Sequence, residues 1–196
     1  MRVGITGHTK GIGRATHDLL KSKGYHVLGF SRSNGYDIAS NFELVLENVL
    51  NKNLDVLINN AYANRHQTNL LKRTYDAWKF QDKLLVNIGS AASLIPKDHL
   101  DYNMEYASDK REQRNFCAEE NFLYSKKNFN IVKCCLTNIN CDYVSTDFKS
   151  KHDKRKYPNL SPNDVANAIL FAIDSFNKKI CIREINMHSR KEPTKL

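Results

Sequence analysis

Tyr106 and Lys110 are the two residues whose types and spacing most directly suggest chemistry. They lie four positions apart, so on a helix their side chains share one face. A tyrosine with a pKa of about 10 is a poor acid or base at neutral pH, but a neighbouring ammonium group favours the phenolate and lowers that pKa. The pair could therefore exchange a proton with a substrate oxygen. The same spacing is common on solvated helix surfaces, which is the alternative interpretation.

A glycine-rich segment at the start of the chain lies between a strand-like stretch and a helix-like stretch. Residues 6–13 read Thr-Gly-His-Thr-Lys-Gly-Ile-Gly. Glycine allows a turn with positive φ and a close approach of the backbone to a ligand. The following helix N-terminus offers free N–H groups and the positive end of its dipole to a pyrophosphate. The segment predicts a dinucleotide site shaped by Gly7, Gly11 and Gly13, and a tight structural turn is the alternative.

Five short motifs resemble those of the short-chain dehydrogenases/reductases, in the same order along the chain. Residues 6–13 are similar to TGxxxGxG, and residues 59–61 match NNA. Residues 87–90 resemble the strand that precedes the catalytic serine, and residues 106–110 match YxxxK. Residues 141–146 resemble the segment written PGxVxT, with its Pro-Gly replaced. The resemblance covers nearly the whole chain, and we interpret the sequence as a shortened, divergent member of this family.

The resemblance implies a nicotinamide dinucleotide cofactor and a role for each matching residue. Tyr106 would be the general acid/base, Lys110 would also bind the ribose hydroxyls, and Ser90 would hydrogen-bond the developing oxyanion. Ser93 is the alternative serine, but Ser90 directly follows the expected strand. Besides Tyr106 and Lys110, the cofactor contacts expected from the motifs are Gly7, Thr9, Gly11, Ile12, Gly13, Asp37, Ile38, Asn60, Ala61, Val144 and Thr146.

The end of the second expected strand indicates which nicotinamide cofactor is used. NAD-selective sites usually have an acidic residue there that binds both ribose hydroxyls, whereas residues 29–33 read Gly-Phe-Ser-Arg-Ser. Arg32 offers a planar fork suited to a phosphate, Ser31 offers a hydroxyl, and Lys10 could reach the same phosphate. We therefore expect NADP(H). The alternative is that both cations are merely exposed.

Two segments depart from the family pattern. The stretch between Asn60 and Asn87 is short, and we expect it to lack the family's long helix; Asn64 and Asn69 are the candidates for the catalytic asparagine of that helix. The segment after Thr146 is basic and would favour an anionic substrate, unless it is only a solvated loop. Its cations are Lys149, Lys151, His152, Lys154, Arg155 and Lys156.

The elements that must position these residues alternate between strands and helices. Strands are expected at 2–6, 25–30, 54–59, 84–89, 130–137 and near 180–187. Helices are expected at 13–23, 41–50, within 102–123 and at 165–173, the last of them started by Ser161, Pro162 and Asp164. The alternation predicts an α/β fold of the Rossmann type, a doubly wound and mostly parallel sheet with helices on both faces. We expect one domain at 1–189 and a flexible tail at 190–196.

Composition limits the partners and the compartment. No apolar run approaches the roughly 20 residues that span a bilayer, so we expect a cytoplasmic protein with no membrane partner. The five cysteines form no CxxC pair, which favours reduced thiols and no metal site. The net charge of +9 fits a polyanionic partner, but no nucleic-acid module is visible, and we expect none to bind. The charged run 109–114 is unlike a buried dimer face, which predicts a monomer or a non-standard oligomer.

These observations together predict an NADP(H)-dependent oxidoreductase with a Ser-Tyr-Lys site. It would act as a carbonyl reductase or alcohol dehydrogenase on a small-molecule substrate. Two alternatives remain open. One is a nucleotide-sugar epimerase or reductase, because related enzymes reuse the Tyr/Lys pair. The other is a non-catalytic NADP(H)-binding sensor, which the lack of an evident asparagine and helix would favour.

Overall fold

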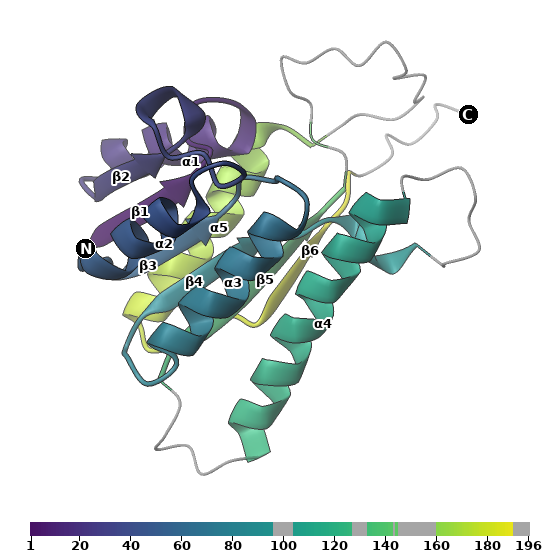
Figure 1. Ribbon diagram of the computed structural model, residues 1–196. Helices are drawn as coiled ribbons and strands as arrows, with labels where there is room; N and C mark the ends of the chain where they lie inside the picture. Colours follow the sequence, from purple (N-terminus) through teal and green to yellow (C-terminus); the bar gives the residue numbers. More distant parts are fainter. Residues whose placement is uncertain (96–103, 127–132, 143, 145–159, 190–196) are drawn as a thin grey trace, which may run out of the picture.

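A six-stranded parallel β-sheet forms the centre of the protein (Figure 1). The computed structural model describes residues 1–95, 104–126, 133–142, 144 and 160–189. The strand order is β2-β1-β3-β4-β5-β6, and every neighbouring pair is parallel. The strands are β1 (Arg2–Thr6), β2 (His26–Phe30), β3 (Val56–Asn59), β4 (Leu84–Ile88), β5 (Cys135–Cys141) and β6 (Glu184–Met187). This arrangement confirms the expected doubly wound α/β fold.

Helices cover both faces of the sheet, because alternate residues of each buried strand point to opposite sides. On one face, α1 (Gly11–Ser22) packs beside α5 (Pro162–Asn177) over Val3, Ile5 and other strand residues. The other face carries α2 (Phe42–Asn51), α3 (Arg65–Trp78) and α4 (Met104–Lys126), over Leu57, Leu85 and Leu136. Two short 3₁₀ turns, η1 (Arg32–Asn34) and η2 (Ala91–Leu94), follow β2 and β4.

The start of α5 confirms the sequence-based expectation in detail. Ser161 Oγ accepts a hydrogen bond from the Asp164 backbone N–H at 3.2 Å, and Asp164 Oδ2 accepts one from the Ser161 backbone N–H at 2.7 Å. Pro162 is the first helical residue. This reciprocal capping box satisfies N–H groups that the helix itself cannot.

A helix lies where we expected none to fit. Between β3 and β4 the chain forms α3, 14 residues long. Its buried residues recur at three- and four-residue spacing, ending at Leu71, Tyr75 and Trp78, which is the pattern of a helix with one face against a core. The stretch is short because its loops are short, so the expectation of a missing helix was wrong.

The fifth strand lies later in the chain than expected. It covers Cys135–Cys141 rather than 130–137, of which 130–132 fall outside the described residues. Asn138 and Asn140 are polar residues typical of turns, but here both are buried strand residues whose amides are hydrogen-bonded. Polar pairing inside the molecule, invisible in the sequence, overrides their turn preference.

Two of the five cysteines are joined, contrary to the expectation of reduced thiols. Cys135 in β5 and Cys181, just before β6, form a disulfide across 46 positions of sequence. Cys117, Cys134 and Cys141 are free and buried. Because parallel strands bring distant segments side by side, sequence spacing did not reveal the pair.

Some expectations concern residues outside the described ranges. These are Thr146, the basic segment 149–156 and the tail 190–196. Among the helices that the structure describes, none is long and apolar enough to cross a membrane.

Candidate functional site

The glycine-rich loop is tied to the end of β3 by a small hydrogen-bond network. Thr6 Oγ1 accepts from the backbone N–H groups of Asn60 and Ala61, both at 2.9 Å. Asn60 Nδ2 in turn donates to the Thr6 carbonyl oxygen at 3.0 Å. Thr6 at the end of β1 and Asn60 just after β3 therefore hold two carboxyl-end loops of the sheet together.

Two glycines are required by the geometry of this loop. Gly7 has φ of +71°, which is the left-handed region that favours glycine. A Cβ on Gly13 would collide with the Gly7 carbonyl oxygen, so only glycine lets α1 begin this close to β1. Lys10 caps α1 without a side-chain bond, and its first turn carries no acidic residue. The N-terminal end of α1 thus retains a positive partial charge.

A hollow of about 540 Å³ lies beside this loop. Its walls also include Phe30, Ser33, Tyr36, Ala39, Tyr62 and Ala63. Most of the expected cofactor contacts line it: Gly7, Thr9, Lys10, Ser31, Arg32, Asp37, Ile38, Asn60 and Ala61. We refer to it as the nucleotide-side hollow.

The two basic residues of the nucleotide-side hollow are more accessible to a ligand than Ser31 is. Lys10 and Arg32 are exposed. Ser31 is buried, and its Oγ lies 2.9 Å from Ser33 Oγ and 3.1 Å from Asn34 Oδ1. Asp37 Oδ1 accepts from the Ala39 backbone N–H at 3.0 Å, which closes a tight turn. The charged groups that line this hollow are therefore two cations, Lys10 and Arg32, and one carboxylate, Asp37.

A second hollow, of about 640 Å³, lies at the carboxyl ends of β4 and β5. We call it the tyrosine-side hollow. Its walls bring together all three residues expected to be catalytic, Ser90, Tyr106 and Lys110, from β4's end and from α4. Ile12 and Val144 line it as well, and it shares Asn60 and Tyr62 with the nucleotide-side hollow.

Ser90 and Ser93 are placed very differently. Ser90 lies at the N-terminal end of η2, where its Oγ accepts from the Ala92 backbone N–H at 3.1 Å, and it lines the tyrosine-side hollow. Ser93 is buried, and its hydroxyl has no hydrogen-bond partner among the described residues. Its hydroxyl faces the interior, which favours Ser90 as the serine available to a ligand.

Lys110 is held inside the protein by three acceptors. Its Nζ donates to Gln67 Oε1 at 2.7 Å, to the Ile88 carbonyl oxygen at 2.9 Å and to Gln113 Oε1 at 3.4 Å. The residue is only 3% exposed. Burial penalises the charged amine and lowers the pKa of Lys110 to about 7, because no ionised partner replaces the lost water in full.

Gln67 is a site residue that sequence reasoning missed. The asparagine candidates Asn64 and Asn69 are both exposed, and the side chain of α3 that reaches Lys110 is instead that of Gln67. A signal was present in the sequence, since Gln67 falls on the same helical face as Leu71 and Trp78. A glutamine on an apolar stripe has to satisfy its amide inside the molecule.

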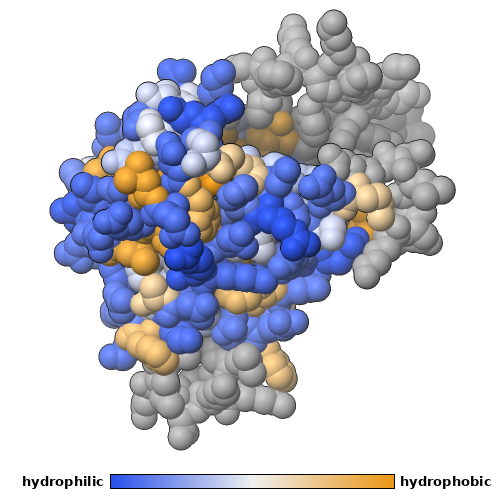
Figure 2. Space-filling model, viewed as in Figure 1, coloured by the Kyte–Doolittle hydropathy of each residue, from blue (hydrophilic) through white to orange (hydrophobic). Residues whose placement is uncertain are grey.

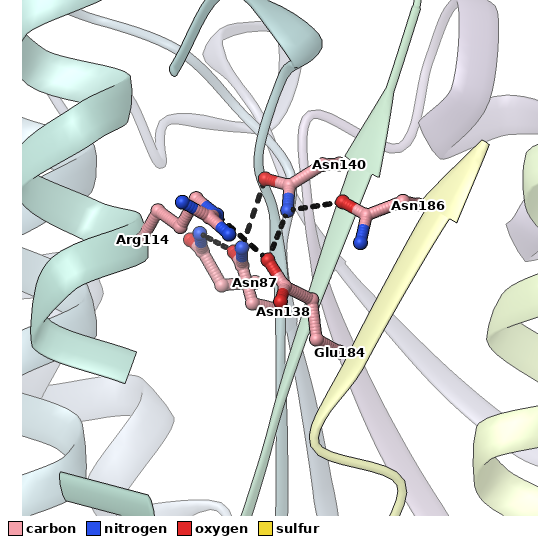
Figure 3. A network of polar contacts seen from close by, with 6 residues as sticks. All are labelled: Asn87, Arg114, Asn138, Asn140, Glu184 and Asn186. Carbon is pink, nitrogen blue, oxygen red and sulfur yellow. Dashed lines mark hydrogen bonds and ion pairs between the residues drawn. The ribbon is translucent and has the colours of Figure 1, made fainter. Parts of the chain in front are cut away.

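The side-chain amides around Lys110 continue as a ladder across the sheet (Figure 3). Asn59 donates to Asn87 at 3.0 Å, Asn87 to Asn138 at 2.9 Å, and Asn138 to Asn140 at 2.9 Å. At the sheet edge Asn140 donates to Glu184 Oε1 at 2.6 Å and to Asn186 at 2.9 Å. We call this chain, Asn59-Asn87-Asn138-Asn140-Glu184, the amide ladder. Gln113 joins it to Lys110, because Asn87 Nδ2 lies 3.2 Å from Gln113 Oε1.

Tyr62 also escaped the sequence analysis. It follows Asn60-Ala61 in the loop between β3 and α3, and its ring meets the Tyr106 ring edge-on, with centroids 4.9 Å apart. Its hydroxyl donates to Asp109 Oδ2 at 3.2 Å. Burial and the nearby Asp109 carboxylate raise the pKa of Tyr62 to about 12. No motif singled out this position, because its partners are all on α4.

The charged run of α4 is used largely within the chain. Asp109, Lys110 and Gln113 are buried, while Glu112 pairs with Lys72 at 2.7 Å and Arg114 with Glu184 at 2.8 Å. Figure 2 shows mainly hydrophilic residues over α3 and α4 on the viewed face. The expectation that this run forms no buried dimer face, and with it the expected monomer or non-standard oligomer, stays a prediction.

The protein is similar to known proteins in its structure but not detectably in its sequence. No protein-family model matches the sequence, and no curated protein does either. Solved structures do match. A 3-alpha-hydroxysteroid dehydrogenase from a Pseudomonas species, complexed with NADH, is 18% identical with a TM-score of 0.75, covering 95% of this chain and 94% of that one.

Two further structures agree with this match. An oxidoreductase of the short-chain dehydrogenase/reductase family from Burkholderia thailandensis has a TM-score of 0.70 at 18% identity, covering 94% of this chain and 90% of its own. ElxO with NADP bound has a TM-score of 0.72 at 20% identity, covering 94% and 96%. At such identities the likeness concerns the fold. The protein has the fold of the short-chain dehydrogenases/reductases over nearly its whole length.

Proposed function

We propose that the protein is an NADP(H)-dependent oxidoreductase that interconverts a carbonyl compound and its alcohol. The observation that carries the proposal is that two hollows lie next to each other and share Asn60 and Tyr62 in their walls. One lies beside a glycine loop and a helix N-terminus, and the other contains Ser90, Tyr106 and Lys110. A nicotinamide dinucleotide has an adenosine half and a nicotinamide half joined by a pyrophosphate, and these could occupy the two hollows.

The residues present fit such a cofactor. Gly7, which has no side chain, lines the nucleotide-side hollow, and Gly13 packs closely against the Gly7 carbonyl oxygen. Phosphate groups would be held by this loop and the positive end of α1. Lys10 and Arg32 would bind a 2′-phosphate on the adenosine side. When bound, the nicotinamide supplies or accepts the hydride, and the protein supplies the rest.

The chain's own contribution is proton transfer and orientation. Tyr106 would give its phenolic proton to the substrate oxygen in reduction and take it back in oxidation. Ser90 would hydrogen-bond the same oxygen as its negative charge develops. Lys110, lying 5.6 Å from the centroid of the Tyr106 ring, would favour the phenolate when protonated. The resemblance to the family's motifs suggests these roles, and the three residues line one hollow, which supports them.

The test is NADPH oxidation against a panel of aldehydes and ketones, with and without Tyr106→Phe. The variant should retain NADPH binding and lose about two orders of magnitude or more in turnover. Tyr25→Phe is the matched control, because Tyr25 hydrogen-bonds Asp174 away from both hollows. Near-normal turnover in Tyr106→Phe would remove Tyr106 from the mechanism.

One observation favours a second function, that of a non-catalytic NADP(H) sensor. All three hydrogen bonds of the Lys110 amine go to Gln67, Ile88 and Gln113 of the protein itself. A lysine retained for structure would look the same. A sensor would bind NADPH at micromolar concentration or below, yet turn over none of the panel, and Tyr106→Phe would leave its only activity, binding, unchanged.

A further inference from the structure

Tyr62 occupies the boundary between the two hollows. It lines both of them and is 39% exposed. Its hydroxyl is anchored on Asp109, which is itself only 3% exposed and belongs to α4. A side chain of the loop between β3 and α3 is thereby bonded to a buried carboxylate of α4.

The anchored ring covers Lys110. The Lys110 amine lies 5.3 Å from the centroid of the Tyr62 ring, and the Tyr106 ring is packed edge-on against that same ring. The polar contacts of the amine all lie on the protein side, with Gln67, Gln113 and the Ile88 carbonyl. A ligand that extends from the nucleotide-side hollow toward Lys110 therefore passes Tyr62, which lines both hollows.

We propose that Tyr62 is a specificity-determining residue, which separates the two hollows and shields Lys110 from ligands that fill only the nucleotide side. This inference rests on the proposed function for the identity of its ligands. An adenosine nucleotide with a 2′-phosphate binds beside the glycine loop with Tyr62 in place. A dinucleotide that reaches Lys110 has to displace the ring, and breaks its bond to Asp109 and its contact with Tyr106.

The consequence is a lowered affinity for the longer ligand only. A binding-competent arrangement that is populated for a fraction of the time weakens apparent binding by that fraction. The hydroxyl anchor and the ring contacts both oppose displacement. Removing the ring should restore the lost affinity, and removing the hydroxyl alone should restore part of it.

The binding experiment compares NADPH with 2′,5′-ADP by calorimetry. Tyr62→Ala should bind NADPH about tenfold more tightly than the unmodified protein, with Tyr62→Phe between the two. The affinity for NADPH relative to that for 2′,5′-ADP should rise in Tyr62→Ala, because only the dinucleotide has to displace the ring. Weaker NADPH binding in Tyr62→Ala, with 2′,5′-ADP unaffected, would make Tyr62 a platform for the dinucleotide and overturn the proposal.

A second measurement needs no nucleotide. Reductive methylation followed by peptide mass spectrometry reports the accessibility of each lysine, with exposed Lys52 as the internal reference. Lys110 should be protected in the unmodified protein and react about tenfold faster in Tyr62→Ala. Tyr36→Ala is the matched control, because Tyr36 lines the nucleotide-side hollow alone, and it should leave Lys110 protected. Equal reactivity of Lys110 in Tyr62→Ala and unmodified protein overturns the shielding.

The two measurements separate this inference from the proposed function. If Tyr62→Ala exposes Lys110 but no variant binds either nucleotide, the shield stands and the dinucleotide function fails. If NADPH binds equally to every variant and Lys110 stays protected in all, the dinucleotide function stands and the role of Tyr62 fails.

Discussion

Lys110 Nζ donates to Gln67 Oε1 at 2.7 Å, a bond between α4 and α3 in the interior of the protein. The amide oxygen of Gln67 thus takes the place that a carboxylate or water would occupy beside a buried ammonium group. An amide oxygen stabilises the charged amine less than a carboxylate does. This difference makes Gln67 a positioning residue whose effect is measurable on Lys110 itself.

The first prediction follows from that bond. Gln67→Met removes the acceptor and should lower the pKa of Lys110 by about one unit or more, since hydrogen bonds to charged groups contribute roughly 1.5–3 kcal/mol. Gln67→Glu should raise it instead. Nitrogen-detected NMR of labelled lysine amines reads the titration directly. Gln81→Met is the control, because the Gln81 side-chain amide donates to the Ala77 carbonyl oxygen at the surface, away from Lys110. An unmoved Lys110 titration in both Gln67 variants would contradict the prediction.

The second prediction concerns stability and pH. Burial lowers the pKa of Lys110 to about 7, so between that pH and its ordinary value the unfolded chain binds more protons than the folded one. Stability supplied by the neutral amine therefore rises with pH across this window. Compared with Lys110→Met, the unmodified protein should gain about 2 kcal/mol of unfolding free energy between about pH 7 and about pH 9. Urea titrations at both pH values measure it, and a constant difference would count against the shifted pKa.

The third prediction concerns cofactor choice. Lys10 and Arg32 are exposed on the wall of the nucleotide-side hollow. Lys10→Ser combined with Arg32→Ala should reduce the preference for NADPH over NADH by about 2–4 kcal/mol and leave NADH binding nearly unchanged. Calorimetric titration of both cofactors decides, with Lys52→Ser as a control for net charge. Equal or tighter binding of NADH by the unmodified protein would refute the assignment of NADP(H).

The fourth prediction tests the amide ladder. Asn138→Ala leaves the Asn87 amide and the Asn140 oxygen without their buried partner. Each unsatisfied buried group costs about 1–3 kcal/mol, so the variant should lose about 2–4 kcal/mol of unfolding free energy. Asn186→Ala, at the exposed end of the network, should cost less than about 1 kcal/mol. Similar losses in the two variants would show that burial of the network is not what matters.

The fifth prediction concerns assembly. The hydrophilic face over α3 and α4 and the internal use of the α4 charges predict that these helices form no apolar dimer interface. Light scattering should give the 22.6 kDa mass of one chain, or an oligomer that a Phe116→Ala or Glu112→Ala change on α4 leaves intact. Dissociation of an oligomer by either change would contradict the argument.

Much of the fold was predictable because it depends on local patterns. Apolar runs located most strands, and Ser161 with Asp164 located α5. The glycine loop was identifiable from its place between β1 and α1. The sequence also indicated Ser90, Tyr106 and Lys110, which line one hollow.

What could not be predicted depends on pairing between distant polar groups. Asn138 and Asn140 resemble turn residues until β4 and β6 supply their partners. Gln67 and Tyr62 can be recognised as site residues only from their contacts with Lys110 and Asp109 of α4. The Cys135–Cys181 disulfide joins segments that neighbour each other only in the folded sheet. In each case the deciding contact is made with a residue far away in the sequence.

The amide ladder is connected to two groups that cannot exchange the roles of hydrogen-bond donor and acceptor. One is Glu184 at its end, and the other is Lys110, which is joined to it through Gln113. The Glu184 carboxylate has no proton to give, so Asn140 must donate to it and turn its own oxygen toward Asn138. The same logic then fixes Asn138 and Asn87 in turn. At the other side the Lys110 ammonium can only donate, which turns the oxygens of Gln67 and Gln113 toward it. The polarity of hydrogen bonds across β4, β5 and β6 is thus set from two sides, by the Glu184 carboxylate through Asn140 and by the Lys110 amine through Gln113.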